Sequence, residues 1–328
     1  MRIAINGFGR IGRMLTRELT DRKNVELVAV NDLSDPATLL HLYKYDSIHG
    51  NRKEGSVLTK NGFQINGQNI AVFSEKNPEH LPWADLDIDI VVESTGLFRD
   101  RAGAGKHLSA GAKKVILSAP PKSEDIKSVC LGINEEILDG SEDIISNASC
   151  TTNSAAPLVK VLRTLTTIEA AYITTIHSYT GDQRLHDTPH NDLRRARAGA
   201  VSIVPTTTGA AKAITKIFPD LGNVMGGCGI RVPVPDGSLT DMTFIVKDTL
   251  SIEQINNAFK KASQTDLKGI LEYTEDPIVS VDIQGNKHSC IFDSLLTSSI
   301  GKMVKVMGWY DNEIGYSARL ADLIEKFK

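Results

Sequence analysis

The sequence has few cysteines, and their spacing excludes several classes of protein. Cys130, Cys150, Cys228 and Cys290 form no Cys-x-x-Cys pair and no other zinc-ligand spacing. Long apolar runs are also missing: none approaches the roughly 18 residues of a membrane-spanning helix, and the run at the N-terminus is too short for a signal peptide. We therefore expect a cytoplasmic protein with no metal site, no membrane partner and at least one free thiol.

An excess of charge of one sign is likewise absent. The 328 residues carry a net charge of −3, so no global cationic field recruits nucleic acid, and we expect no dedicated nucleic-acid site. With 41% hydrophobic and 23% charged residues, the composition is that of a globular protein, which excludes disorder as the main description. At about 100–200 residues per domain, the length predicts roughly two domains.

The first 150 residues alternate short apolar runs with helical patterns, which predicts a parallel, doubly wound α/β sheet. The segment 60–73 differs, because Asn61-Gly62 and Asn66-Gly67 indicate hairpin turns. The expected strands are 2–6, 25–30, 88–93 and 114–118, and the expected helices are 13–20 and 102–110.

After Cys150 the strands and helices are grouped rather than alternating. This grouping predicts an α+β domain with an antiparallel or mixed sheet. The expected strands are 170–178, 241–247, 277–283 and 302–309, and the expected helices are 151–165, 209–218, 251–262 and 316–327.

The run Gly7-Phe8-Gly9-Arg10-Ile11-Gly12 is a Gly-x-Gly-x-x-Gly pattern that follows a strand and opens a helix. Its glycines allow a tight turn and close backbone approach to a pyrophosphate, and the helix N-terminus supplies amide donors. The pattern alone also fits an ordinary turn, but Asp32 follows Gly12 by 20 residues, where a carboxylate can bind a ribose. Asp32 would repel a 2′-phosphate, so the sequence favours NAD over NADP.

Cys150 lies in Ser146–Asn153 (SNASCTTN), between an apolar strand and a helix. At or beside the helix N-cap, the dipole and the unpaired amides are expected to lower the pKa of the thiol and to hold an oxyanion. The other three cysteines lie in apolar surroundings and fit the commoner role of a buried structural cysteine. We therefore predict that Cys150 is a nucleophile.

His177 ends an apolar strand 27 residues after Cys150, and a Cys–His pair provides a nucleophile with its general base. By spacing alone an ordinary strand-end histidine is the favoured reading, and only the wider pattern supports catalysis. That pattern includes groups suited to anions, although some of the arginines fit a solvated or interface role equally well. The groups are Ser149/Thr151, Thr180-Gly181-Asp182, Arg194-Arg195-Ala196-Arg197, Thr206-Thr207-Thr208-Gly209 and Arg231.

Taken together, the motifs resemble those of the phosphorylating glyceraldehyde-3-phosphate dehydrogenase family, in order and over essentially the whole chain. The matching segments are INGFGRIGR (5–13), KYDSIHG (44–50), ESTG (93–96), SNASCTTN (146–153), DLRRAR (192–197), TGAAKA (208–213) and WYDNEIGYS (309–317). The resemblance implies a dinucleotide-binding (Rossmann) domain of residues 1–149 with a C-terminal helix in 312–328, and a catalytic domain of 150–311. It also implies a homotetramer, with residues 178–200 near subunit interfaces.

The resemblance further implies NAD-dependent conversion of D-glyceraldehyde 3-phosphate and inorganic phosphate to 1,3-bisphosphoglycerate. Cys150 would form a thiohemiacetal and then a thioester, and His177 would be the base. The substrate phosphate would contact Thr180 and Arg231, with Asp182 beside them, and the attacking phosphate would use Ser149, Thr151, Thr208 and Gly209. Arg194 matches the family's anion-binding arginine, although Arg195 adjoins it. Cofactor contacts are expected at Asn6, Gly7, Gly9, Arg10, Ile11, Gly12, Asp32, Lys76, Thr95, Ser118 and Asn312.

Two other functions share parts of this pattern. Erythrose-4-phosphate dehydrogenase has the same fold and nucleophile, but Thr180 favours the triose enzyme, and hydrolysis rather than phosphorolysis of the thioester would distinguish the two. A non-catalytic NAD-binding or RNA-binding regulator is disfavoured, because every catalytic position is filled and the net charge is negative. Thr188 stands where NAD enzymes of this family often carry leucine, which weakens the preference for NAD without reversing it.

Overall fold

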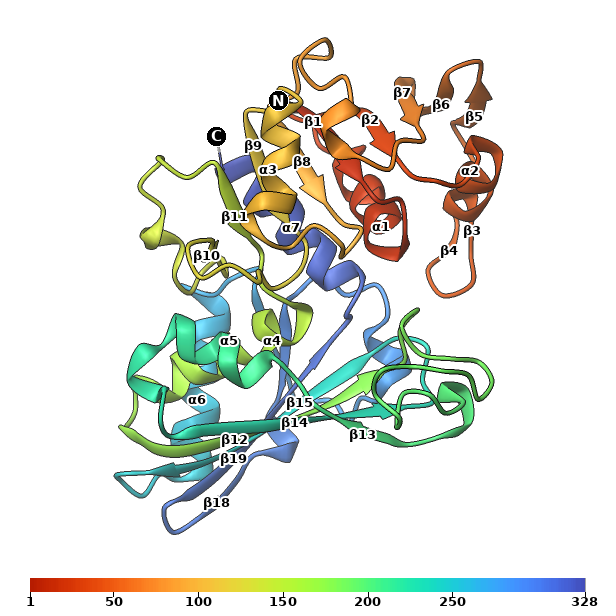
Figure 1. Ribbon diagram of the computed structural model, residues 1–328. Coiled ribbons are helices and arrows are strands. Elements are labelled where there is room, and N and C mark those ends of the chain that lie inside the picture. The colour runs from red at the N-terminus through yellow and green to blue at the C-terminus, as the bar shows by residue number, and fades with distance from the viewer. Residues whose placement is uncertain (328) are drawn as a thin grey trace. The chain divides into compact units, whose positions relative to one another are not determined.

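The computed structural model describes residues 1–327, which divide into two compact units (Figure 1). The first unit consists of Met1–Val129, Glu135–Ala148 and the chain from Ser317 onward, and the second of Cys130–Asn134 and Ser149–Tyr316. The division expected from the sequence differs from these units at Ser149, at residues 130–134 and at residues 312–316.

The first unit is built on a nine-stranded sheet. Its strands are β1 (Arg2–Asn6), β2 (Glu26–Asn31), β5 (Ser56–Thr59), β6 (Gly62–Ile65), β7 (Gln68–Phe73), β8 (Ile90–Glu93), β9 (Lys114–Leu117), β10 (Lys127–Ser128) and β11 (Ile144–Ser146), and a separate pair is β3 (Tyr45–Asp46) with β4 (Gly50–Asn51). Its helices are α1 (Arg10–Leu19), α2 (Pro36–Lys44), α3 (Arg101–Ser109) and most of α7 (Ile314–Lys326). The strand order is β10-β11-β9-β8-β1-β2-β7-β6-β5.

Strands β10 to β7 of this order are parallel, as the alternating pattern predicts. The apolar residues of β1 and β8 are buried, which explains why they read as continuous hydrophobic runs. At one edge, β6 pairs antiparallel with both β5 and β7. Asn66 and Gly67 adopt positive φ angles of 48° and 82° in the β6–β7 turn, so the predicted hairpins are confirmed.

The second unit contains a mixed eight-stranded sheet. Its strands are β12 (Ile168–Ser178), β13 (Val204–Thr206), β14 (Met225–Val232), β15 (Ser238–Val246), β16 (Leu271–Thr274), β17 (Cys290–Asp293), β18 (Ser298–Ile300) and β19 (Met303–Tyr310). The strand order is β13-β14-β12-β15-β19-β17-β16, with β18 beside β19. Antiparallel pairs predominate, but β12–β14 and β16–β17 are parallel, so the predicted α+β architecture with a mixed sheet is confirmed.

Three helices of the second unit pack against this sheet: α4 (Cys150–Arg163), α5 (Ala210–Ile217) and α6 (Ile252–Gln264). Their buried side chains share one apolar core with those of β12, β15 and β19. Within that core the rings of Phe259 and Phe292 stack at 3.9 Å between centroids. Packing of helices on a sheet in this way makes the sheet a rigid support for residues at the strand ends.

One sequence expectation about this architecture is wrong, and one helix was not foreseen. Residues 277–283 form no strand but end in a short 3₁₀ turn, Ser280–Ile283. The Asp282 carboxylate accepts a hydrogen bond from the Val279 amide at 2.7 Å, and such local bonds compete with a sheet ladder. Helix α2 was not expected, although Asp35 caps it and Pro36 is its first residue, both ordinary features of a helix start.

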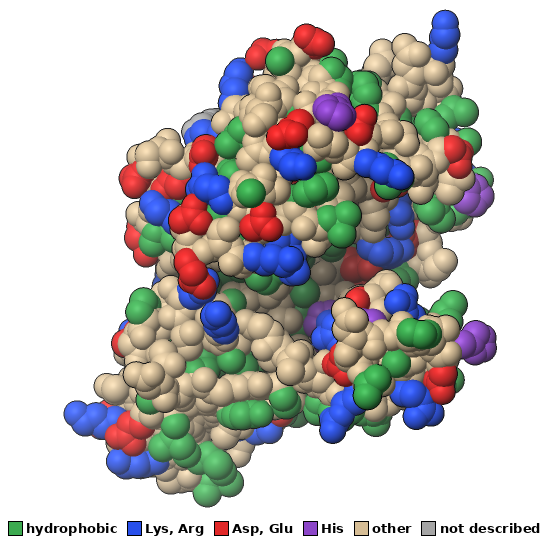
Figure 2. All heavy atoms as spheres, viewed as in Figure 1, with side chains coloured by type: hydrophobic (Ala, Val, Ile, Leu, Met, Phe, Trp, Pro, Cys, Tyr) green, Lys and Arg blue, Asp and Glu red, His purple; other side chains and the backbone are tan. Residues whose placement is uncertain are grey.

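The surface of the chain mixes charges of both signs. Figure 2 shows acidic and basic side chains interspersed over the visible face, in keeping with the net charge of −3. None of the helices within residues 1–327 combines the length and the apolar character needed to cross a membrane.

Candidate active site

A cavity of about 530 Å³ lies in the first unit at the carboxyl ends of β1, β2 and β8. Ligands of open α/β sheets bind at this edge, and small-molecule sites usually measure about 300–1,000 Å³. Six of its lining residues are ones for which the sequence predicts cofactor contacts: Asn6, Gly7, Gly9, Asp32, Lys76 and Thr95.

The glycine turn at this cavity leaves no room for side chains at two of its three positions. Gly7 has φ +97°, and a Cβ atom there would lie 2.7 Å from the Thr95 nitrogen. A Cβ atom at Gly12 would lie 2.2 Å from the Gly7 carbonyl oxygen, so helix α1 packs directly on the turn. A Cβ atom at Gly9 would meet nothing within 4 Å, which leaves open backbone beside the N-terminus of α1. The turn therefore fits a pyrophosphate, as the motif predicts.

The Asp32 carboxylate is held at the cavity by backbone amides. Its Oδ2 accepts a hydrogen bond from the Phe8 amide at 2.9 Å, and its Oδ1 accepts one from the Ser34 amide at 3.0 Å. These bonds fix the carboxylate beside the glycine turn, where an adenosine ribose lies in this fold. The cavity therefore offers backbone amides as donors for a pyrophosphate and the Asp32 carboxylate as an acceptor for ribose hydroxyls.

The other expected cofactor residues lie elsewhere. The Arg10 guanidinium pairs with the Asp46 carboxylate at 2.5 Å, and within the described residues Arg10, Ile11, Gly12 and Ser118 are not part of the cavity lining. Asn312 belongs to the second unit. Its Oδ1 accepts hydrogen bonds from the hydroxyls of Ser178 at 2.8 Å and Ser238 at 2.7 Å, which leaves its amide nitrogen to donate.

In the second unit, Cys150 is the first residue of helix α4. Ser149 is the N-cap, and its hydroxyl accepts a hydrogen bond from the Thr152 amide at 3.1 Å. The Cys150 Sγ lies 3.5 Å from Nε2 of His177. Just before the cap, Ala148 has φ +52°, a strained conformation for a non-glycine residue that is common at functional turns. The predicted pair of nucleophile and base is thus in contact range.

Strand register sets the environment of His177. In the parallel β12–β14 pair, His177 is directly opposite Arg231. The His177 Nδ1 lies 2.7 Å from the Ser178 carbonyl oxygen and 3.0 Å from Nη1 of Arg231, which also donates to that carbonyl at 3.1 Å. When Nδ1 donates to Ser178, the lone pair of Nε2 faces the Cys150 thiol. This is the orientation that a general base requires.

The expectation that the helix N-terminus lowers the pKa of Cys150 is wrong for this structure. Burial is the largest influence and raises the pKa of the thiol, although the charge of Arg231 and the Thr151 amide act to lower it. The free energy needed to remove the thiolate from water therefore exceeds the stabilisation that the helix N-terminus and the Arg231 charge provide. Burial thus opposes ionisation of the Cys150 thiol, and Arg231 and the Thr151 amide favour it.

His177 is correspondingly neutral. Burial, followed by the positive charge of Arg231, lowers the pKa of His177 to about 3. A neutral imidazole can accept the Sγ proton as the sulfur attacks a carbonyl carbon. The geometry therefore supports proton transfer that accompanies attack.

Arg195 and the Asp182 carboxylate that pairs with it are charged residues of this site. Arg195 donates to the Asp182 carboxylate at 2.8 Å and to the Thr206 hydroxyl at 3.0 Å. Burial is the largest cause that lowers the pKa of His177 and of Arg231, and the charge of Arg195 acts in the same direction on both. The charge of Arg195 thus acts on His177, whereas Arg194 is exposed to solvent.

The hydroxyls expected to hold phosphate lie at helix starts or strand ends. The Thr151 hydroxyl follows the nucleophile on α4 and lies 2.9 Å from the Tyr310 hydroxyl. Thr208 precedes the N-cap Gly209 of α5, and its hydroxyl accepts from the Ala210 amide at 3.2 Å. Thr180 is half-buried just beyond the end of β12. Each lies in the second unit, as do Cys150 and His177.

Sequence reasoning missed Tyr310. Its hydroxyl lies 2.9 Å from both the Thr151 and Thr175 hydroxyls, and its ring meets His177 edge-on at 6.0 Å between centroids. Tyr310 therefore packs against His177 and lies beside the residue that follows Cys150. Its position two residues before Asn312, inside the WYDNEIGYS segment, is a signal that could have found it.

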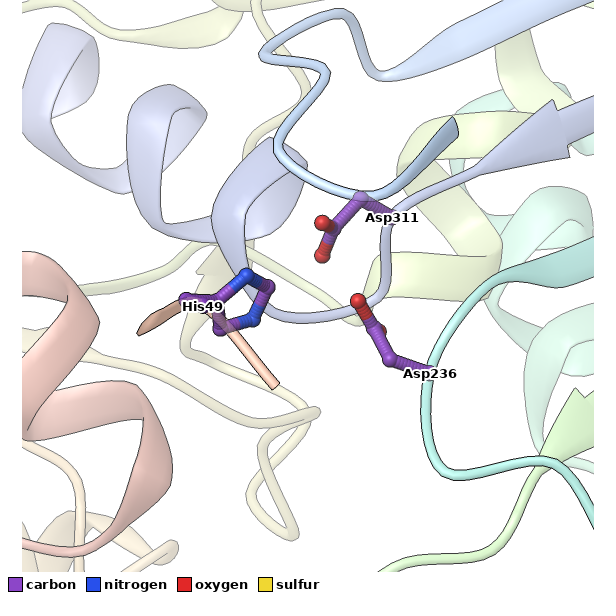
Figure 3. A group of neighbouring side chains, drawn as sticks. All are labelled: His49, Asp236 and Asp311. Atoms are coloured by element: carbon purple, nitrogen blue, oxygen red, sulfur yellow. The ribbon is translucent and has the colours of Figure 1, made fainter. Parts of the chain in front are cut away.

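Two carboxylates of the second unit, Asp236 and Asp311, have oxygens within 4.8 Å of each other (Figure 3). Asp311 accepts hydrogen bonds from the amides of Glu313 at 2.8 Å, Ile314 at 2.7 Å and Gly285 at 2.8 Å. Its oxygens are thus committed to the start of α7 and to a neighbouring turn. This role is structural.

The remaining cysteines differ in accessibility. Cys130 and Cys290 are buried, and burial raises the pKa of Cys290 to about 12, which makes that thiol inert. Cys228 is only half-buried and lies 3.8 Å from the Thr174 hydroxyl, so the expectation of a fully apolar setting is wrong for this residue. Cys150 remains the one cysteine that faces a histidine at a helix N-terminus among those described.

A dinucleotide-type cavity in one unit and a thiol facing a neutral imidazole in the other are features of a cofactor-dependent enzyme. Comparison with known proteins identifies which one. Residues 1–101 match the family model for the NAD binding domain of glyceraldehyde 3-phosphate dehydrogenase, and residues 149–312 match the model for its C-terminal domain. The chain belongs to the glyceraldehyde-3-phosphate dehydrogenase family.

Full-length relatives agree with the family models. The chain is 52% identical to glyceraldehyde-3-phosphate dehydrogenase 2 of Streptomyces avermitilis over 98% of this chain and 97% of the relative. It is 53% identical to the glyceraldehyde-3-phosphate dehydrogenase of Thermotoga maritima over 99% and 98%, and 50% identical to that of Geobacillus stearothermophilus over 98% and 97%. Because these matches span both units, the resemblance seen in the motifs is confirmed.

Proposed function

We propose that this chain catalyses the NAD-dependent oxidation and phosphorylation of D-glyceraldehyde 3-phosphate to 1,3-bisphosphoglycerate. The observation that carries the proposal is the 3.5 Å approach of the Cys150 Sγ to Nε2 of His177, with Arg231 directly beside that histidine. A thiol, a base and a cation grouped in this way suit a covalent reaction on a phosphorylated aldehyde.

The catalytic pair moves protons at defined atoms. The Cys150 Sγ forms a bond to the aldehyde carbon while its proton passes to Nε2 of His177, and His177 delivers that proton to the former carbonyl oxygen, which gives the thiohemiacetal hydroxyl and a neutral imidazole. His177 then removes the hydroxyl proton as the carbonyl re-forms and a thioester results. NAD, when bound, accepts the hydride that leaves the carbon in this step. Inorganic phosphate next attacks the thioester carbon, the C–S bond breaks, and Cys150 recovers its proton.

Amides at the start of α4 support the oxyanion of each tetrahedral species. The first amides of a helix lack internal acceptors, and Cys150 is the first helical residue. These amides are therefore proposed to stabilise the negative charge that develops on the substrate oxygen as the bond forms.

Two groups of residues are proposed to bind phosphate. Thr180 and Arg231 bind the phosphate of the substrate, and Asp182 holds Arg195 in place through its 2.8 Å ion pair. Ser149, Thr151, Thr208 and Gly209 bind the attacking phosphate. Arg195 takes the anion-binding role there that the resemblance assigned to Arg194, because Arg195 is the residue held beside the site.

The cofactor is proposed to contact Asn6, the glycine turn, Asp32, Lys76 and Thr95 in the first unit. Arg10, Ile11 and Ser118 are proposed to approach it through their backbone, since the Arg10 side chain is committed to Asp46. The amide of Asn312 is proposed as a further donor to the cofactor.

We also propose that the protein is a cytoplasmic homotetramer. Segment 178–203 exposes Leu185 (78%), Leu193 (81%), Val201 (81%) and Ile203 (70%), which is unusual for apolar side chains of a monomer. The second unit's sheet also exposes Tyr172, Ile245, Ile300 and Met303, and Figure 2 shows apolar side chains gathered over the end of that unit that carries β18. A second copy of the chain would cover these surfaces.

The test is an assay of NAD reduction by the purified protein. Glyceraldehyde 3-phosphate and erythrose 4-phosphate are each supplied with and without inorganic phosphate. We expect the triose phosphate to be preferred and its sustained turnover to require phosphate. Preference for erythrose 4-phosphate with phosphate-independent turnover would instead establish the related hydrolytic dehydrogenase.

A further inference from the structure

Behind the cofactor cavity of the first unit lies a chain of buried polar side chains. Asn6, Asn31, Glu93, His107 and Trp83 are each no more than 4% exposed. They come from β1, β2, β8, α3 and the loop before β8. Buried polar groups are retained only when each donor meets an acceptor, so their hydrogen-bond directions can be deduced.

One end of this chain is set by the indole of Trp83. The Trp83 Nε1 lies 3.0 Å from Nδ1 of His107, and an indole N–H can only donate. Nδ1 must therefore be an acceptor, so the proton of the neutral imidazole is on Nε2. That nitrogen lies 3.2 Å from Oε2 of Glu93, to which it donates.

The other end is set by the backbone of Glu75. Its amide donates to Oδ1 of Asn31 at 2.8 Å, so Nδ2 of Asn31 must face Oδ1 of Asn6, at 2.7 Å. The Nδ2 of Asn6 is then the group that faces Oε2 of Glu93, at 2.6 Å, and it donates. Both ends of the chain thus direct donors at the same carboxylate oxygen.

The second oxygen of Glu93 binds the neighbouring loop. Oε1 accepts hydrogen bonds from the Thr95 amide at 2.8 Å and from the Thr95 hydroxyl. Thr95 and Asn6 both line the cofactor cavity, and Thr95 touches the tight position at Gly7. The Glu93 carboxylate therefore ties the loop after β8 to the glycine turn after β1.

We propose that Glu93, His107 and Trp83 are positioning residues for cofactor binding. Glu93 is the common acceptor that holds both walls of the cavity, and Trp83 restricts His107 to the tautomer that donates to it. The inference rests on the proposed cofactor site, and it adds three residues that do not touch the cofactor.

The central experiment is a double-substitution cycle read by the Kd for NAD, measured calorimetrically. Glu93→Gln places an amide NH₂ against a donor in every orientation, because Asn6, His107 and the Thr95 amide all donate. We expect Glu93→Gln to raise the Kd about tenfold or more. Trp83→Phe frees His107 to move its proton to Nδ1 and to accept, at Nε2, a hydrogen bond from the amide introduced at position 93. The Kd for NAD of the double variant should therefore be lower, by about threefold or more, than the Kd calculated by adding the effects of the two single substitutions.

A matched pair at position 107 separates donation from packing. His107→Gln keeps a nitrogen donor toward Glu93 and should retain NAD affinity to within about threefold, whereas His107→Leu removes the donor and should weaken binding about tenfold. Ser154→Ala in the second unit removes a buried hydroxyl pair with Thr240 and serves as the stability control. It should lower the melting temperature and leave the Kd for NAD unchanged.

Several results would decide against the proposal. Additive effects in the double variant, or equal Kd values for the Gln and Leu variants, would show that the three residues are merely structural. A lower melting temperature with an unchanged Kd for NAD in these variants would also show that the three residues are merely structural. Asp32→Ala tests the site itself: if it weakens NAD binding while the Glu93 and His107 variants do not, the positioning role fails and the proposed function stands. If Asp32→Ala also has no effect, the cofactor site is wrongly placed.

Discussion

The cofactor cavity of the first unit and the nucleophile of the second are assembled by different means. The cavity is lined by residues at the carboxyl ends of the parallel strands β1, β2 and β8, and among them are Gly7 and Gly9 of the glycine turn. The nucleophile site draws Cys150 from a helix start, His177 from β12 and Arg231 from β14. The register of the β12–β14 pair sets His177 opposite Arg231, and Cys150 meets His177 from the start of α4.

This difference indicates how sensitive each site is to side-chain substitution. Backbone donors at a glycine turn tolerate side-chain substitution as long as the glycines remain. The second site depends on three side-chain groups: the thiol of Cys150, a ring nitrogen of His177 and the guanidinium of Arg231. Side-chain changes there should therefore have larger effects on turnover, while the first unit continues to bind its cofactor.

Replacement of the nucleophile should show this separation most strongly. We expect Cys150→Ala to lower kcat by about 10⁴-fold or more, because the covalent route is lost, and to leave the Kd for NAD unchanged. Steady-state assays and calorimetry measure the two quantities. Cys228→Ala is the matched control and should keep full activity; loss of activity there but not at Cys150 would reassign the nucleophile.

Replacement of the base should have the next largest effect. His177→Asn should slow formation of the thioester by roughly 10²–10⁴-fold, because the Sγ proton then has no acceptor. A burst of NADH in single-turnover experiments measures this step. If the burst rate is unchanged, the contact between Sγ and Nε2 plays no part in proton transfer.

The two adjacent arginines provide a comparison within one loop. Arg195→Leu should raise the KM for inorganic phosphate about tenfold or more, because a charged hydrogen-bond donor to the anion is lost. Arg194→Leu should change it less than about twofold, since Arg194 is exposed to solvent. A larger effect at Arg194 would restore the assignment that the sequence alone suggested.

A smaller effect is expected from the first unit. The unmodified enzyme should have a kcat/KM at least about tenfold higher with NAD than with NADP, because Asp32 binds the ribose hydroxyls and repels a 2′-phosphate. Asp32→Asn should narrow this difference mainly by weakening NAD binding. Comparable efficiency with both cofactors before substitution would show that other residues set the preference.

The smallest expected effect is a shift in a pH profile. Since burial raises the pKa of Cys150, its alkylation by iodoacetamide should continue to accelerate above the ordinary thiol pKa of about 8.5. A raised pKa leaves the thiol protonated at neutral pH, so the thiolate fraction increases only as the pH rises toward that value. A midpoint below about 8 would show that the helix end and His177 outweigh burial.

The predictability of each element follows from how local its determinants are. The parallel sheet, the hairpins and the glycine turn were predictable because apolar periodicity, Asn-Gly pairs and three glycines act over a few residues. Strand β14 (MGGCGIRV) was missed, because glycines conceal the alternation of its side chains. The strand expected at residues 277–283 failed for the opposite reason: its β-branched residues are overridden by the Asp282 carboxylate, which bonds back to Val279.

The sequence by itself determined the chemical inventory: the glycine turn with Asp32, the cysteine at a helix start, the histidine at a strand end, and the family to which the chain belongs. Only the tertiary structure decided which arginine stands beside His177 and how the thiol ionises. Both depend on burial and on the direction of side chains that meet across strands far apart in the chain. The free energy of a charge is set by everything that replaces water around it, and no local pattern of residues specifies that environment.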